Sequence, residues 1–179
     1  MKFEPTQIDG AFLVAIEPRT DDRDWFARAW CEEEFRAQGL EVRAVQTNVS
    51  FNHRRGTIRG LHWQMEPFGE AKLVRCIAGA IFDVIVDVRS DSPTYGGWQG
   101  THLAAGGQVL VHVPEGCAHG YQAMADGTEV SYNVSGAYVP GAERGIRWDD
   151  PAFGIAWPLT EAIVSEKDAS WADFALEHR

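Results

Sequence analysis

Between about residues 43 and 134 the chain alternates short apolar runs with turn-forming residues. Seven runs are rich in β-branched and aromatic side chains: VRAVQTNVSFN, TIRGLHWQ, AKLVRCIAG, AIFDVIVDVR, GWQGTHLA, QVLVHVP and TEVSYNVSGAYV. Gly, Pro, Asn and Asp punctuate them, as in AGGQ, PEG and ADGT, and this composition is typical of strands joined by tight turns. Many short strands with few helices predict an all-β fold, either a sandwich or a barrel.

Two short helices are expected outside these strands. One covers residues 31–38, CEEEFRAQ, and the other lies near the C-terminus at residues 166–178, EKDASWADFALEH. The sequence contains no repeat, low-complexity segment or linker. Its length suits one core of ordinary size, so we expect a single domain over residues 1–179.

Period-two alternation assigns the residues of each strand to opposite faces. In GTIRGLHWQ, His62 shares a face with Ile58, Gly60 and Gln64, whereas Arg59 falls on the opposite face. A bulge at Gly60 would bring His62 and Arg59 to the same side of the sheet. Whether the titratable ring of His62 is structural or functional therefore depends on the residues that surround it in the fold.

Lys72 and Tyr132 are also flanked by apolar residues on their own faces, in KLVRC and EVSYNV. The chain has three lysines, Lys2, Lys72 and Lys167, and only Lys72 lies in the middle of the apolar strands. A buried lysine is costly unless it is paired or used. A mostly apolar pocket with a few converging polar groups is typical of a small-ligand site.

The composition is that of a folded protein, with 45% hydrophobic and 11% aromatic residues, which excludes disorder. No apolar run approaches the roughly 20 residues of a membrane span, and the start MKFEPTQIDG has no apolar signal core. The three cysteines, Cys31, Cys76 and Cys117, are odd in number and far apart. We therefore expect reduced thiols in the cytoplasm and no membrane partner.

The net charge of −10 makes nucleic acid a poor partner, because phosphate binding requires a basic surface. Basic residues nevertheless gather in one part of this acidic chain: Arg54, Arg55, Arg59, Lys72 and Arg75. Such a group is either a solvated face or a local anion site, for example for a diphosphate.

The segment PEGCAH, residues 114–119, has the form P-x-G-x-x-H. It resembles the second conserved motif of the cupin superfamily, whose members are small jelly-roll barrels. In metal-binding cupins the first motif supplies two histidines as H-x-H, but here the stretch reads His62-Trp63-Gln64. A metal needs three or more well-placed donors, so we expect no bound metal. The alternative is a site formed by His62, Gln64, Glu70 and His119.

Without a metal, these residues suit acid–base chemistry. A neutral His62 imidazole accepts a proton at neutral pH, and the Tyr132 phenol donates one. Lys72 could stabilise an enolate oxygen. An aspartate could fix the imidazole tautomer, and the sequence offers Asp83 on its strand and Asp168 in the C-terminal segment. The set indicates proton abstraction next to a carbonyl, followed by reprotonation.

Seven segments together carry a resemblance to a known family. They are GTIRGLHWQ, KLVRC, FDVIVDVR, SPTYGGW, VPEGCAHGY, GIRWDDPAFGIAWP and SEKDA. In order and spacing they resemble the dTDP-4-dehydrorhamnose 3,5-epimerase family of deoxysugar pathways, from about residue 3 to residue 170. The resemblance implies a cupin-type jelly-roll homodimer that acts on a nucleotide-linked 4-keto-6-deoxy sugar without a metal or other cofactor.

The resemblance also implies roles for individual residues. His62 matches the base, Asp168 its supporting carboxylate and Tyr132 the proton donor, while Lys72 matches the lysine that stabilises the enolate. The positions that match substrate-binding residues are the diphosphate-binding Arg23 and Arg59, the pocket histidine His119, Gln46 and Asn48 near the nucleotide, and Tyr138 beside the thymine.

The chain departs from the family pattern mainly around the substrate. In RDWFAR, Asp24 replaces the usual glycine and Arg28 the usual glutamate. Arg28 would favour an extra anionic or acceptor group on the ligand if it faces the site. The other departures are Thr47 and Val49 where Asp and His are frequent, Ala137 in place of a tyrosine before Tyr138, and Cys117 for Phe.

These departures affect the identity of the substrate more than the type of reaction. The chain could use another nucleotide or invert one carbon only. Two other classes remain alternatives: a sugar-nucleotide 3,4-ketoisomerase, which would move the carbonyl, and a binding cupin without turnover. Intact His62, Lys72, Tyr132 and Asp168 argue against the binding cupin.

Overall fold

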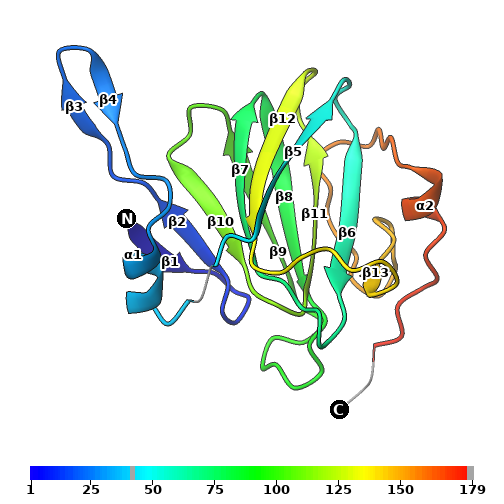
Figure 1. The fold of residues 1–179 in the computed structure, drawn as a ribbon. Helices are drawn as coiled ribbons and strands as arrows, with labels where there is room; N and C mark the ends of the chain where they lie inside the picture. Colours follow the sequence, from blue (N-terminus) through cyan, green and yellow to red (C-terminus); the bar gives the residue numbers. More distant parts are fainter. Residues whose placement is uncertain (41–42, 177–179) are drawn as a thin grey trace.

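Two antiparallel sheets face each other in the computed structural model, which describes residues 1–40 and 43–176 (Figure 1). The six-stranded sheet has the order β1–β2–β10–β7–β12–β5, and the five-stranded sheet has the order β13–β6–β11–β8–β9. The six-stranded sheet contains β1 Lys2–Pro5, β2 Phe12–Ala15, β5 Gln46–Asn52, β7 Lys72–Ala78, β10 Val109–Val113 and β12 Thr128–Val134. The five-stranded sheet contains β6 Ile58–Gln64, β8 Ala80–Asp87, β9 Trp98–Ala104, β11 Cys117–Ala123 and β13 Glu143–Gly145. This arrangement confirms the predicted all-β jelly-roll class with short peripheral helices.

A separate two-stranded arm, β3 Arg19–Asp21 and β4 Asp24–Phe26, projects away from the sheets. The helices are α1 Glu32–Ala37 and α2 Glu166–Ala169. The C-terminal helix expected over residues 166–178 was therefore too long, since it ends at Ala169. Positions 42 and 177–178 of the expected segments lie outside the described residues.

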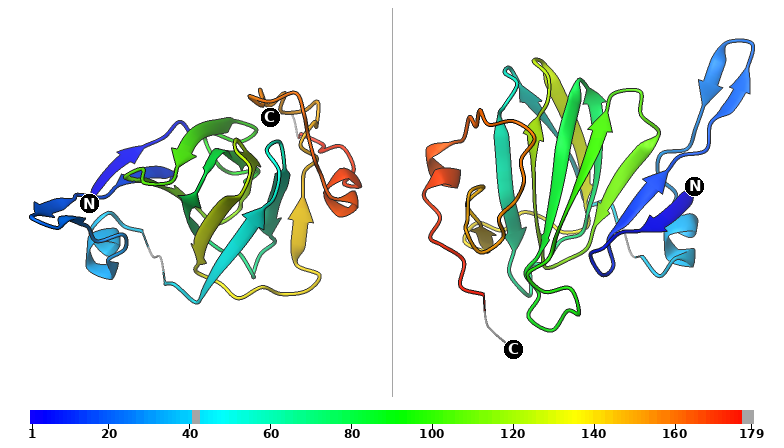
Figure 2. Two further views of the ribbon diagram at one scale, coloured as in Figure 1. Left: turned by 90° about the horizontal axis from the view of Figure 1, so that it is seen from above. Right: turned by 180° about the vertical axis from the view of Figure 1, so that it is seen from behind.

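The apolar core lies between the two sheets, where Val74, Ile85, Val111, Cys117 and Val130 are among its buried members. Figure 2 shows the two sheets enclosing this space when the molecule is viewed from above. Alternation along the strands explains the packing, because each strand sends every second side chain inward.

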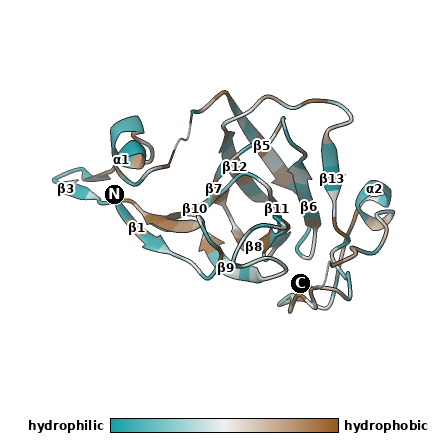
Figure 3. Cartoon of the chain, turned by 90° about the horizontal axis from the view of Figure 1, so that it is seen from below, coloured by the Kyte–Doolittle hydropathy of each residue, from teal (hydrophilic) through white to brown (hydrophobic). Residues whose placement is uncertain are grey.

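The outer faces of both sheets are covered as well. Phe35 of α1 packs with Val14, Leu73 and Leu110 on the six-stranded sheet. On the five-stranded sheet, Val84 of β8 packs with residues of the C-terminal segment such as Ile146 and Phe153. In Figure 3 the two helices are mostly hydrophilic and lie at opposite sides of the molecule. The C-terminal segment is thus fixed against the sheet that carries His62.

Several strands were not predicted. The N-terminal strands β1 to β4, the short β13 and the central strand β11 were not recognised, and the expected TEVSYNVSGAYV strand stops at Val134. In β11 the sequence CAHGYQA contains small residues and Gly120, which weaken the strand signal. Its two partner strands, β6 and β8, nevertheless bury all seven of its residues.

Candidate active site

The local geometry of β6 brings two predicted residues to one side. Against β11, His119 pairs with His62 and Tyr121 with Arg59, so β6 carries one extra residue across this register shift. Gly60 adopts φ +106, and a Cβ there would lie 2.6 Å from the Gly120 Cα. Only glycine fits such a site. A bulge, which the sequence allowed at Gly60 but did not require, is therefore present, and both Arg59 and His62 line the same cavity.

The His62 ring is held by an acidic residue that is far away in sequence. Its Nε2 lies 2.7 Å from Asp168 Oδ1, and the side chain of His62 is 26% exposed against 8% for Asp168. A carboxylate only accepts hydrogen bonds, so Nε2 carries the hydrogen and Nδ1 the lone pair. Burial alone would raise the pKa of Asp168, but the hydrogen bond from His62 helps to hold it below its ordinary value.

The C-terminal segment positions Asp168 through backbone contacts. Ile163 forms a parallel bridge with Thr57 at the start of β6, and the Ile58 amide donates to the Ile163 carbonyl at 2.9 Å. Ser165 then caps α2 by accepting from the Asp168 amide at 3.1 Å. The segment SEKDA therefore begins a short helix at the point where its aspartate meets His62.

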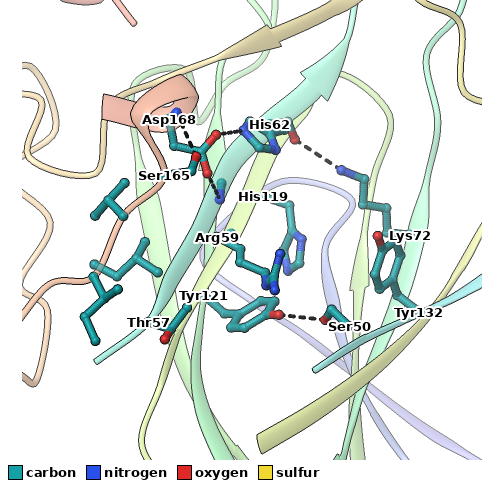
Figure 4. Close-up of a pocket in the computed structure, with 15 residues that line it drawn as sticks. Ser50, Thr57, Arg59, His62, Lys72, His119, Tyr121, Tyr132, Ser165 and Asp168 are labelled. Carbon is teal, nitrogen blue, oxygen red and sulfur yellow. Dashed lines mark hydrogen bonds and ion pairs between the residues drawn. The ribbon is translucent and has the colours of Figure 1, made fainter. Parts of the chain in front are cut away.

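Lys72 and Tyr132 lie on neighbouring strands of the opposite sheet and face His62 (Figure 4). Lys72 is 7% exposed, donates from Nζ to the His62 carbonyl at 3.1 Å and lies 3.5 Å from Glu70. Burial lowers the pKa of Lys72 and raises that of Tyr132. The phenol therefore keeps its proton at neutral pH, as a proton donor requires.

These residues border a cavity of about 440 Å³ and a smaller one of about 140 Å³. His62, Lys72 and Tyr132 line both cavities, so they lie where the two meet. The larger cavity also contains Arg59 and His119. The smaller one contains three of the predicted nucleotide-binding residues: Gln46, Asn48 and Tyr138.

Asp83, the other aspartate considered as a partner for His62, binds a different histidine. Its Oδ2 lies 2.7 Å from Nε2 of His119, and their side chains are 1% and 9% exposed. Its second oxygen, Oδ1, is buried and has no hydrogen-bond partner among residues 1–40 and 43–176. The site therefore contains two histidine–aspartate pairs.

Arg59 belongs to a polar network at the wall of the larger cavity. Its Nε donates to Asn52 at 2.9 Å, and Asn52 donates to the Tyr121 hydroxyl at 3.2 Å. The Tyr121 hydroxyl lies 2.7 Å from Ser50 Oγ, and both residues line the cavity. Sequence reasoning missed Ser50, Asn52 and Tyr121. Extending the alternation of Asn48 along β5 would have found the first two, because residues 48, 50 and 52 share a face.

Arg23 and Arg28 do not line either cavity in this chain. Arg23 lies at the turn of the arm, where its guanidinium pairs with Asp21. Arg28 follows β4 and lies 2.8 Å from Glu34 near α1. Asp24, which replaces the usual glycine, is the one described non-glycine residue with positive φ, at +125. The arm thus keeps the backbone that a glycine would adopt easily.

Within residues 1–40 and 43–176, no group of three or more His, Cys, Asp or Glu side chains is placed to hold a metal ion. Gln64, the residue in the second histidine position of a metal cupin, accepts from the Val139 amide at 2.7 Å and donates to two backbone carbonyls and Glu70. Over the same residues no helix is both long and apolar enough to cross a membrane.

The chain is similar to known proteins over most of its length. The family model described as dTDP-4-dehydrorhamnose 3,5-epimerase matches residues 5–175. A protein of that name from Methanothermobacter thermautotrophicus is 45% identical over 173 residues, which cover 95% of this chain and 92% of the relative.

Solved structures show the same similarity. The dTDP-4-dehydrorhamnose 3,5-epimerase of Bacillus anthracis, with TDP and pyrophosphate bound, superposes with a TM-score of 0.92 at 37% identity, covering 97% of this chain and 99% of that one. A 3'-monoepimerase from Streptomyces bikiniensis in complex with dTDP-quinovose gives 0.87 at 33% identity, covering 94% and 86%.

Proposed function

Because this chain belongs to the dTDP-4-dehydrorhamnose 3,5-epimerase family, we propose that it inverts carbons beside the ketone of a dTDP-linked sugar. The substrate is dTDP-4-dehydro-6-deoxy-D-glucose and the product is dTDP-4-dehydro-L-rhamnose. The observation that carries this proposal is the His62–Asp168 pair, 2.7 Å apart, where two cavities meet beside Lys72 and Tyr132.

The proposed chemistry follows from this arrangement. His62 Nδ1 takes the proton from a carbon next to the C4 ketone. The electron pair of that C–H bond forms a C=C bond to C4, and the π pair of the carbonyl moves to the ketone oxygen. Asp168 stabilises the imidazolium that forms, and the Lys72 ammonium stabilises the enolate oxygen. The Tyr132 hydroxyl then gives its proton to the carbon, and delivery to the opposite face inverts the centre.

In this proposal each cavity binds a different part of the substrate. Arg59 and His119 in the larger cavity hold polar groups of the sugar and its diphosphate. The nucleotide extends through the smaller cavity, where Gln46, Asn48 and Tyr138 offer two amide side chains and an aromatic ring. Tyr138 is 55% exposed, so its ring is accessible for stacking against the nucleotide base.

The N-terminal arm is assigned to a second subunit. We place Arg23 and Arg28 in the site of a partner copy within a homodimer, since neither lines the two cavities that meet at His62 in its own chain. The arm also presents Trp25 and Phe26 with exposures of 45% and 74%, and exposed aromatic side chains of this kind are enriched at interfaces. Gel filtration with light scattering tests the dimer.

The mechanism needs no metal or other cofactor. Each histidine of the site already binds an aspartate, and Gln64 is satisfied by its neighbours. Treatment with a chelator should leave the rate unchanged. Stoichiometric metal that is lost together with activity would contradict this assignment.

A cytoplasmic location is part of the same proposal. Its support is the chemistry of the three cysteines, Cys31, Cys76 and Cys117, all of which are free. Free thiols are typical of a reducing compartment.

The test is incubation with dTDP-4-keto-6-deoxyglucose in deuterated water, followed by NMR. We expect deuterium at C3 and C5 with inversion at both carbons. Label at one carbon would define a monoepimerase, and movement of the carbonyl would define a 3,4-ketoisomerase. The absence of both exchange and product would overturn the proposal.

A Tyr132→Phe variant separates the two halves of the reaction because it removes only the donated proton. The variant should still wash out substrate hydrogen while it makes little inverted product. Equal loss of exchange and inversion would instead place Tyr132 in the first step.

A further inference from the structure

A second carboxylate lies beside His62, on the side away from Asp168. Glu143 Oε1 is 3.7 Å from Nδ1 of His62. Glu143 belongs to β13, which pairs with β6 so that Gly145 lies opposite His62 and Glu143 opposite Gln64. The acid–base steps assigned to His62, Lys72 and Tyr132 do not use this carboxylate.

The tautomer of His62 determines whether Glu143 faces a lone pair or an N–H group at Nδ1. Because Nε2 donates to Asp168, Nδ1 holds the lone pair and receives the proton that leaves the sugar. At 3.7 Å the carboxylate is too far to form a hydrogen bond with the resting ring, so the lone pair stays free. A small rotation of either side chain is enough to bring the two groups within hydrogen-bond distance once Nδ1 is protonated.

The two carboxylates differ in their access to solvent. The Asp168 side chain is 8% exposed and held by hydrogen bonds from both His62 and the Gly60 amide. Glu143 is 19% exposed and pairs with Lys167, whose side chain is 56% exposed. A proton on Glu143 can therefore reach water, whereas a proton passed to Asp168 would remain inside the site.

The other ionisable groups around His62 are engaged elsewhere. Lys72 donates to the His62 carbonyl and pairs with Glu70, and His119 is bound to Asp83. Tyr132 is the proposed donor and keeps its own proton. Among the described residues, Glu143 and Asp168 are the two carboxylates in contact with the His62 ring.

We propose that Glu143 is the proton exit of His62, a role that rests on the proposed epimerase function. After an abstraction, the Nδ1–H bond of the imidazolium breaks and an O–H bond forms on Glu143. Water then removes this proton, so that His62 and Glu143 both return to their starting states. An enzyme that inverts two carbons of one bound sugar with a single base must return that base to its neutral form between the two abstractions.

The experiment compares Glu143→Ala with two control variants in deuterated water. Lys167→Ala removes the same ion pair but keeps the carboxylate. Glu166→Ala removes an exposed carboxylate from α2 that has no hydrogen-bond partner among the described residues. NMR follows deuterium incorporation and inversion separately at C3 and C5.

In Glu143→Ala the second of the two exchanges should slow by roughly 100-fold, the lower end of the range for acid–base groups, so that singly inverted sugar accumulates. Added acetate should restore the second exchange by replacing the missing carboxylate, and it should not affect the wild type. Lys167→Ala should stay within about fivefold of the wild type, because a partly exposed ion pair contributes little, and Glu166→Ala within about twofold.

Three results would overturn the proton exit while leaving the epimerase intact. They are an unchanged ratio of first to second exchange in Glu143→Ala, a loss that acetate does not restore, and an equal loss in Lys167→Ala. A wild-type protein that exchanges no substrate hydrogen would instead overturn the proposed function, and the proton exit with it.

Discussion

Two histidine–aspartate pairs lie side by side in this protein and differ in what surrounds them. His62 and His119 are directly paired on β6 and β11, and each has its Nε2 2.7 Å from a carboxylate. The side chain of His62 is 26% exposed, against 9% for His119. Equal hydrogen bonds therefore do not imply equal roles: greater exposure and the neighbouring Glu143 carboxylate distinguish the proposed base.

The origin of each aspartate explains the difference. Asp83 lies on β8, beside β11, in a regular ladder that pairs it with Tyr121. Its hydrogen bond with His119, 2.7 Å long, fixes the orientation of that ring within the sheet. Asp168 lies on a C-terminal helix outside the ladder and binds Nε2 of His62, so Nδ1 keeps its lone pair for the substrate proton.

The largest expected effect separates the two histidines. His62→Ala should lower kcat by roughly 10²–10⁴-fold because it removes the base. His119→Ala should mainly raise KM, with kcat within about tenfold, because it removes a binding contact. Steady-state kinetics on both variants checks this. A similar collapse of kcat in both would mean that the pairs share the chemistry.

The aspartates should differ in the same direction. Asp168→Asn should lower kcat by roughly 100-fold, because an amide neither fixes the tautomer nor stabilises the imidazolium. Asp83→Asn should act mostly on KM. If kcat falls further in Asp83→Asn than in Asp168→Asn, the assignment of the two pairs is reversed.

A third histidine shows what burial does without a carboxylate. His112 is 3% exposed and lies 3.2 Å from the Gly10 carbonyl. Burial lowers its pKa from 6.5 to about 4. Below pH 6.5 the unfolded chain gains a proton that the folded protein binds only near pH 4, so stability is lost as the pH falls through this window.

We therefore expect His112 to account for roughly 2 kcal/mol of the stability lost between about pH 7 and pH 5. Urea unfolding of the wild type and of His112→Phe at both pH values measures this difference. The variant should lose correspondingly less stability on acidification, even if it is less stable at pH 7. An equal loss in both proteins would assign the acid sensitivity to other groups.

The smallest expected effect lies in the arm. Arg28→Glu restores the glutamate that is usual in the family and should shift preference towards the dTDP-linked sugar. The shift should be only about two- to fivefold, because Arg28 is exposed and already paired with Glu34. The kcat/KM values for dTDP-, UDP-, CDP- and GDP-linked 4-keto sugars provide the comparison. If all four ratios change by less than about twofold, Arg28 does not determine specificity.

Much of the barrel side of the site could be predicted from local pattern. Alternation placed Lys72 and Tyr132 among apolar residues of their own faces, whereas the glycine in IRGLHWQ only allowed the bulge that brings Arg59 and His62 to one side. The choice between Asp83 and Asp168 could not be made from residue pattern, because His62 and Asp168 are 106 positions apart. Sequence spacing does not indicate that the C-terminal segment packs against the strand that carries His62.

Glu143 and the arm were beyond sequence reasoning for a related reason. β13 has three residues, too short for its alternation to indicate a strand, so nothing in the sequence placed Glu143 beside His62. The arm carries Arg23 away from the two cavities at His62, and alternation within one chain does not indicate where such an arm lies.

The central claim is that His62, and not its neighbour His119, removes the sugar proton. Its most direct test is the rate at which substrate hydrogen exchanges with deuterated water, followed by NMR for the wild type, His62→Ala and His119→Ala at saturating dTDP-4-keto-6-deoxyglucose. The account predicts that exchange at C3 and C5 disappears in His62→Ala and persists in His119→Ala. Near-normal exchange in His62→Ala would contradict it.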